Sequence, residues 1–146
     1  MLYGNDRKRM RQVFFEAWRK HRQNEILEPL ERRIVAVIRQ HPEYHALLER
    51  PEAHLEEDFA PEQGVTNPFL HMGMHLGIAE QLAADMPPGI RDLYQRLTAR
   101  RGDAHAAEHE IMECLGETLW LAQRAGAEPD PVHYLTCLRK RLGQSM

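Results

Sequence analysis

The stretch NPFLHMGMHLGIAEQLAAD, residues 67–85, decides the fold because it forms one long, mostly apolar segment with a defined start and stop. Asn67 followed by Pro68 is a specific helix start, since the amide oxygen caps the first turn and proline fits the first helical position. The Pro-Pro-Gly run at 87–89 cannot continue a helix. The sequence therefore predicts a helix from Asn67 to about Asp85.

Helical spacing extends outward from this stretch in both directions. Apolar residues recur three and four positions apart, which is typical of amphipathic helices, and no alternating strand pattern competes. Residues 58–67 contain proline, glycine and threonine and predict a loop. We expect further helices over residues 6–22, 29–40, 42–48, 51–57, 90–99, 104–125 and 131–142. The sequence therefore predicts an all-α fold, a single-domain helical bundle of five to six helices over residues 1–146.

Length and composition restrict the class of protein. A chain of 146 residues with 42% apolar and 28% charged residues fits one globular domain and excludes a disordered or fibrous chain. The longest charge-poor stretch, residues 67–79, is too short to cross a bilayer, and no signal peptide is evident. We therefore expect a cytoplasmic protein that does not contact membranes. Cys114 and Cys137 lack zinc-finger partners and are expected to be reduced thiols packed in helices. Trp18 and Trp120 are expected to lie in the core.

The charges are distributed unevenly along the chain. Residues 7–24 are mainly basic, whereas residues 43–62 are mainly acidic, so the two segments are expected to attract each other. The basic residues near the start point in several directions around a helix and have no aromatic platform beside them, so nucleic acid is an unlikely partner. These basic residues are Arg7, Lys8, Arg9 and Arg11.

Histidines are paired more often than chance predicts. The chain has nine histidines. Roughly 0.5 pairs at a spacing of four residues would arise at random, and such pairs share one face of a helix. Three pairs are present: His41 with His45, His71 with His75, and His105 with His109. Pro42 lies inside the first pair, so the other two are the stronger candidates for a site.

The two stronger pairs suggest a metal centre between neighbouring helices. His71 and His75 lie on the apolar face of their predicted helix, and His105 and His109 flank an apolar face of theirs. Neutral imidazoles and a carboxylate on packed helices are suitable ligands for zinc, iron or manganese. The sequence thus predicts a divalent metal site built from His71, His75, His105, His109 and Glu113, and indicates no organic cofactor.

A structural role for the histidines is the alternative. Buried histidines often form polar networks with carboxylates or carbonyls and bind no ion, as in a non-catalytic interaction or adaptor module. The metal motifs Glu-x-x-His (doubled) and His-Glu-x-x-His are absent from the sequence, and catalysis stays uncertain. The partner is unknown. An apolar stripe of Val132, Leu135 and Leu138 would either form a homodimer contact or close the bundle.

Several longer motifs are shared with a known family. They are HPEYH at 41–45, NPFLH at 67–71 followed by His75, PGIR at 88–91 and IMECLGE at 111–117. With FFEAWR at 14–19, these motifs resemble those of a proteobacterial family catalogued as domain of unknown function 1841. The resemblance implies a small helical bacterial protein, and it transfers no reaction, substrate or cofactor. It also implies that certain residues belong to recurrent motifs, namely His45, His71, His75, His105, His109 and Glu113.

Overall fold

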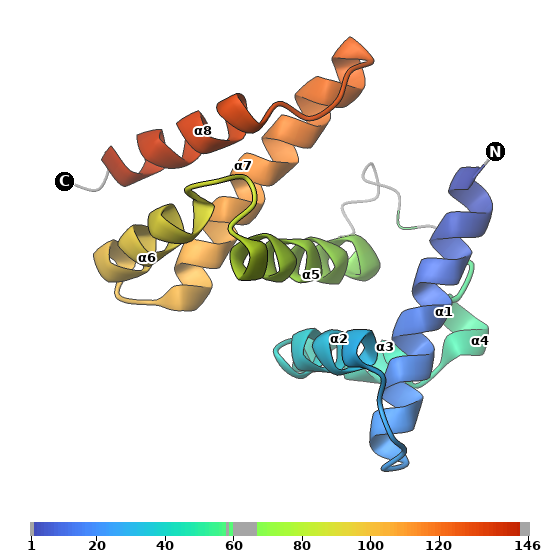
Figure 1. The fold of residues 1–146 in the computed structure, drawn as a ribbon. Helices are drawn as coiled ribbons and strands as arrows, with labels where there is room; N and C mark the ends of the chain where they lie inside the picture. The colour runs from blue at the N-terminus through green and yellow to red at the C-terminus, as the bar shows by residue number, and fades with distance from the viewer. Residues whose placement is uncertain (1, 58, 60–66, 144–146) are drawn as a thin grey trace. The chain divides into compact units, whose positions relative to one another are not determined.

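A computed structural model describes residues 2–57, 59 and 67–143, with side chains from residue 8 onward. The all-α prediction is confirmed, and the described residues contain no strand (Figure 1). Their helices are α1 (Leu2–Arg22), α2 (Pro29–Arg39), the 3-10 helix η1 (Pro42–Tyr44), α3 (His45–Leu48), α4 (Pro51–His54), α5 (Pro68–Ala84), α6 (Ile90–Arg101), α7 (Ala104–Ala125) and α8 (Pro131–Gly143). The expected count of five to six is too low, because the described residues contain eight α-helices when the short helices α3 and α4 are counted with the longer ones.

Local signals set the helix boundaries where the sequence indicates them. The Asn67 side chain accepts hydrogen bonds from the backbone N–H groups of Phe69 and Leu70 at 3.0 and 3.2 Å, which caps α5. Asp103 caps α7 in the same way by accepting from the N–H of His105 at 3.0 Å. Most of the predicted loop at 58–67 lies outside the described residues.

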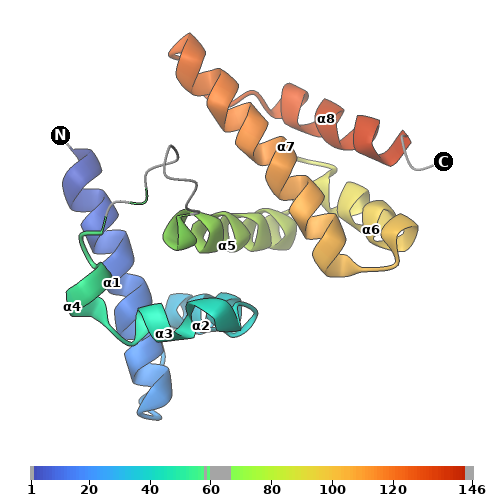
Figure 2. The same ribbon diagram turned by 180° about the vertical axis from the view of Figure 1, so that it is seen from behind.

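The chain falls into two compact units, residues 1–76 and 77–146, with α5 spanning the boundary between them. In the first unit, α2 packs against α1 (Figure 2). The interior is apolar and rich in aromatic rings, and Phe69 at the start of α5 contacts Phe14 and Phe15 of α1 at ring-centroid distances of 6.2 and 5.5 Å. This contact fixes the N-terminal half of α5 against α1. The prediction of a single domain remains a prediction.

A buried arginine links the two oppositely charged segments of the first unit. Arg11 is only 1% exposed, and its guanidinium donates to the carbonyl oxygens of Leu55 and Glu57 at 3.1 and 2.6 Å. Its charge also lies 4.9 Å from the ring centroid of Phe69. The Lys8–Glu56 ion pair at 3.0 Å also connects the two segments, as the expected attraction predicts. Arg11 is thus part of the interior and is not a surface contact for nucleic acid.

In the second unit, α6, α7 and α8 pack against one another. One fully buried side chain from each helix contributes to the core: Leu97, Ile111 and Leu138. The C-terminal part of α5 adds Gln81, whose side-chain oxygen accepts a hydrogen bond from the Tyr134 hydroxyl at 2.7 Å. Burial raises the pKa of Tyr134.

Two expectations about the second unit are corrected. Cys114 and Cys137 are not separate thiols but form a disulfide between α7 and α8, with their Cα atoms 5.8 Å apart. The helical hairpin brings together residues that are 23 positions apart in the sequence. Trp120, expected in the core, is 53% exposed beside Arg124. Of the apolar stripe on α8, Leu138 is buried and Val132 is 68% exposed, so a homodimer stays a prediction.

Candidate metal centre

Two of the predicted ligands lie one turn apart on α5. His71 and His75 are four residues apart, so both side chains project from the same side of the helix. Their ring centroids lie 4.9 Å apart with the ring planes at 70°. His75 is 1% exposed and His71 is half-buried. The Asn67 cap and the Phe69 contacts hold this turn in place, so α5 presents the two rings from a fixed backbone.

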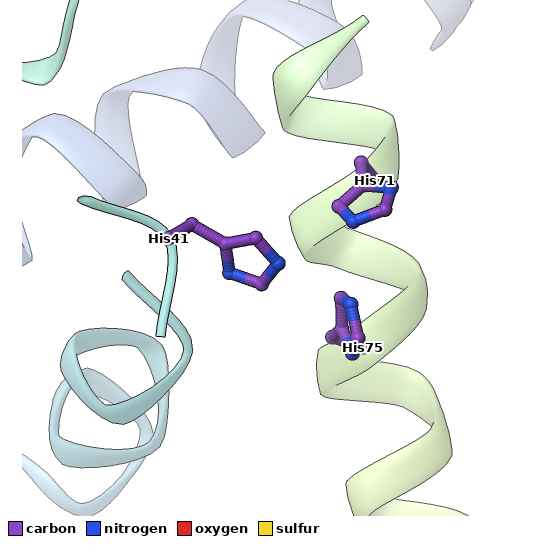
Figure 3. A group of neighbouring side chains, drawn as sticks. All are labelled: His41, His71 and His75. Atoms are coloured by element: carbon purple, nitrogen blue, oxygen red, sulfur yellow. The ribbon is translucent and has the colours of Figure 1, made fainter. Parts of the chain in front are cut away.

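His41 brings a third imidazole to the pair from a different element. It follows the end of α2, where its backbone N–H donates to Ile38 O at 2.9 Å. Pro42 follows it and disfavours the helical region for its backbone, which is observed outside that region at φ −128° and ψ 68°. The ring thereby points toward α5 (Figure 3), with its centroid 5.1 Å from that of His71 and 4.7 Å from that of His75.

The three rings are close enough to share one ion. Each offers a nitrogen, and the three chosen nitrogens lie within 4.8 Å of one another. A tetrahedral zinc with Zn–N bonds of about 2.1 Å places its nitrogens roughly 3.4 Å apart. Binding one tetrahedral zinc would therefore require the rings to turn toward the ion. Within the described part of the chain, the group contains only histidine, so it offers imidazole nitrogens and no carboxylate.

A backbone contact sets the tautomer of His41. Its Nδ1 lies 2.8 Å from the carbonyl oxygen of Val37. Because a carbonyl only accepts, Nδ1 must carry the proton, and in the neutral ring Nε2 then presents its lone pair. Metal-binding histidines are commonly oriented by this kind of contact from the second ring nitrogen. The end of α2 thus presets His41 as an Nε2 ligand.

Tyr44 covers one side of the cluster. Its ring stacks on that of His41 at 5.5 Å and 11°, and it meets His71 edge-on at 6.2 Å. Burial raises the pKa of the Tyr44 hydroxyl, and the neighbouring Glu43 carboxylate raises it further. The phenol is therefore neutral beside the three imidazoles at physiological pH.

The remaining predicted ligands belong to the second unit. His105 is exposed, while His109 is half-buried and its Nδ1 donates to the His105 carbonyl at 3.1 Å. Their ring centroids lie 4.3 Å apart. Glu113 is exposed and forms an ion pair with Arg141 at 2.7 Å. The prediction that these three residues bind a metal stays a prediction, and the group of three described above does not include them.

Sequence reasoning gave His41 too little weight. Its partner in the sequence pattern, His45, turns away to place its ring 4.5 Å from that of Trp18 and its Nε2 2.9 Å from Ile38 O. His41 and His45 therefore do not share one helix face despite their spacing of four residues, because Pro42 interrupts the helix between them. The useful signal was the position of His41 at a helix end before a proline, where the backbone is fixed.

Together, the helices and the three clustered imidazoles define an all-helical protein with a histidine-rich candidate site. The chain belongs to the family described as Domain of unknown function (DUF1841), whose profile matches residues 6–140. No curated protein matches the chain, and no solved structure matches it. Among the described residues, no helix combines the length and apolar character needed to cross a membrane.

Proposed function

We propose that this protein binds one divalent metal ion through the imidazoles of His41, His71 and His75. The supporting observation is the convergence of three histidines from two separate elements on one point, with their ligand atoms within 4.8 Å. Two of the three are buried, at 3% and 1% exposure for His41 and His75. Three imidazoles packed together in an interior are costly if protonated, whereas a bound cation makes use of all three lone pairs.

The ligand set favours zinc, with iron and manganese as the other candidates. Neutral imidazole suits zinc and iron, whereas manganese prefers oxygen ligands that this group lacks. Three protein nitrogens are fewer than the four ligands of a closed structural zinc site, so one position is left for water or a small ligand. A metal with such an open position can activate water or polarise a carbonyl. His41, His71 and His75 would hold the ion. The carbonyl oxygen of Val37 orients the His41 ring, and the burial of His41 and His75 limits access of solvent.

The test is elemental analysis of the full chain produced without a histidine tag, combined with thermal melts before and after chelation. We expect about one ion per chain and a melting temperature that falls when the ion is removed. The variant His41→Gln should reduce the bound metal to a small fraction. Substoichiometric metal together with an unchanged melt would instead favour the structural polar network of a non-catalytic interaction module.

His45→Gln is the matched control. It changes the same residue type in the same segment, four positions from His41, at a ring that packs against Trp18 in a tilted arrangement and lies outside the cluster. Metal content should be unchanged in this variant. An equal loss of metal in both variants would show that metal binding depends on the fold of this segment and not on the imidazole of His41.

A further inference from the structure

The disulfide of the second unit has one protected sulfur and one accessible sulfur. Cys114 on α7 is fully buried, whereas Cys137 on α8 is half-buried. Cys137 also lines a surface hollow of about 270 Å³ formed by α7 and α8. Cys114 does not line this hollow. A nucleophile arriving from solvent therefore reaches the disulfide at Cys137.

The hollow lies between two side-chain contacts that connect the same helices. On one side of Cys137, His133 forms a hydrogen bond with Glu117 at 3.0 Å, and on the other side Arg141 forms an ion pair with Glu113 at 2.7 Å. The Glu113 carboxylate is thus already matched by a positive charge. Lys140, which also lines the hollow and is exposed, adds a further positive charge beside the sulfur.

We propose that Cys137 is a site of reversible thiol–disulfide exchange with a small anionic peptide thiol of the glutathione class. The hollow is slightly smaller than a typical drug-sized pocket, so it suits a small thiol better than the loop of a protein oxidoreductase. Nearby cations favour a thiolate and attract carboxylates. The cytoplasm, where the sequence predicts the protein to act, keeps most thiols reduced, and disulfides there are usually transient.

The exchange is balanced in two steps. The attacking thiolate bonds to Sγ of Cys137, the bond to Cys114 breaks, and the Cys114 sulfur leaves with the electron pair and takes up a proton. A second thiolate then attacks the sulfur of the bound peptide, which releases the oxidised peptide dimer and leaves Cys137 as a thiol. The protein disulfide gains two electrons, and two peptide thiols lose them.

The proposal predicts an asymmetry between the two cysteines. In the folded variants Cys114→Ala and Cys137→Ala, each remaining thiol is exposed to oxidised glutathione, and adduct formation is followed by intact-mass spectrometry. Cys137 should react at least about tenfold faster than Cys114, because only Cys137 borders the hollow. In urea the two rates should become similar. Equal rates in the folded proteins, or a faster Cys114, would overturn the proposal.

The wild-type chain provides an independent check that does not depend on how the variants fold. Brief exposure to reduced glutathione, followed by acid quench and peptide mapping, should place the mixed disulfide on Cys137 only. Full reduction should lower the melting temperature by about 10 °C, because the crosslink that restrains the unfolded chain is lost. An adduct found mainly on Cys114 would overturn the assignment.

Charge selectivity tests the class of thiol. In the Cys114→Ala background, where Cys137 is a free thiol, Lys140→Gln should slow the reaction of Cys137 with glutathione disulfide several-fold at low salt and leave its reaction with the neutral hydroxyethyl disulfide unchanged. Arg139→Gln, an exposed basic residue on α8 that does not line the hollow, is the matched control and should change neither rate. Equal slowing with both disulfides would show that the hollow does not select an anionic thiol.

Discussion

The two units place their polar side chains in opposite ways. In the first unit, Arg11, His41 and His75 are each at most 3% exposed, so ionisable groups form part of the interior. In the second unit, His105 and Glu113 are exposed, and the helices are connected by a disulfide over an apolar core. Two histidine pairs with identical spacing therefore lie in different environments.

This difference shows that spacing alone does not make a site. A buried polar group costs free energy unless it is matched, so an interior that retains three such groups requires partners for them. The carbonyls at 54–57 provide such partners for Arg11. His41 has a partner in the carbonyl oxygen of Val37, which accepts from its Nδ1 at 2.8 Å, and we propose that a metal ion binds the three imidazoles.

The largest expected effect is in the apolar core of the second unit. Leu138→Ala removes a fully buried side chain and should lower the free energy of unfolding by about 3 to 4 kcal/mol, measured by urea denaturation. Val132→Ala, on the same helix but 68% exposed, should change it by less than about 0.5 kcal/mol. A large loss in Val132→Ala would mean that its side chain is covered, as in a homodimer.

The corresponding effect in the first unit should come from a charged residue. Arg11→Met keeps the length of the side chain but leaves the carbonyl oxygens of Leu55 and Glu57 without their donor, so we expect a loss of about 3 kcal/mol. Arg9→Met, on the exposed face of α1, is the control and should stay within about 0.5 kcal/mol of wild type. Similar losses of unfolding free energy in Arg11→Met and Arg9→Met would show that the buried charge of Arg11 does not stabilise the first unit.

Metal should stabilise the first unit specifically. Zinc at about one hundred times its dissociation constant should raise the free energy of unfolding by about 2.7 kcal/mol, because it binds only the folded chain. The gain should disappear in His75→Gln and at acidic pH, where protons compete for the ring nitrogens. Hydrogen exchange should show the added protection in residues 29–45 and 68–76. Protection confined to α7 would contradict the account.

The smallest expected effect is a pH dependence at the start of α6. The Asp85 carboxylate accepts hydrogen bonds from the N–H groups of Arg91 at 3.0 Å and Gly89 at 3.3 Å, which lowers its pKa from 3.8. A lowered pKa adds stability that is present above 3.8 and is lost as the pH falls through the folded value. Asp85→Asn should therefore be less stable than wild type at pH 7 and equal to it in acid. A difference that is constant with pH would be inconsistent with this role.

The parts of the fold that depend on short-range signals were predictable from the sequence. The Asn67-Pro68 start, the Pro-Pro-Gly stop and the Asp103 cap act within a few residues, and the helix boundaries follow them closely. Two members of the candidate site, His71 and His75, were found because a helix face is a local property.

The rest depends on contacts between distant residues, which the periodicity of one sequence cannot show. Arg11 meets Glu57 across 46 positions and Cys114 meets Cys137 across 23. His41 meets His75 only because α2 ends where it faces α5 (Figure 3). The spacing of four residues grouped His41 with His45 as a pair on one helix face. In the structure Pro42 begins a new helical segment between them, so the two rings lie apart.

The central claim is that the cluster in the first unit, and not the equally spaced pair in the second, binds the metal. The most direct measurement is a zinc titration of two full-length double variants, His71→Gln/His75→Gln and His105→Gln/His109→Gln, in competition with a chromogenic chelator. We expect the first to lose at least about a hundredfold in affinity, since two of three ligands are gone. The second should bind one zinc as tightly as wild type. A loss in the second variant with binding retained in the first would contradict the account.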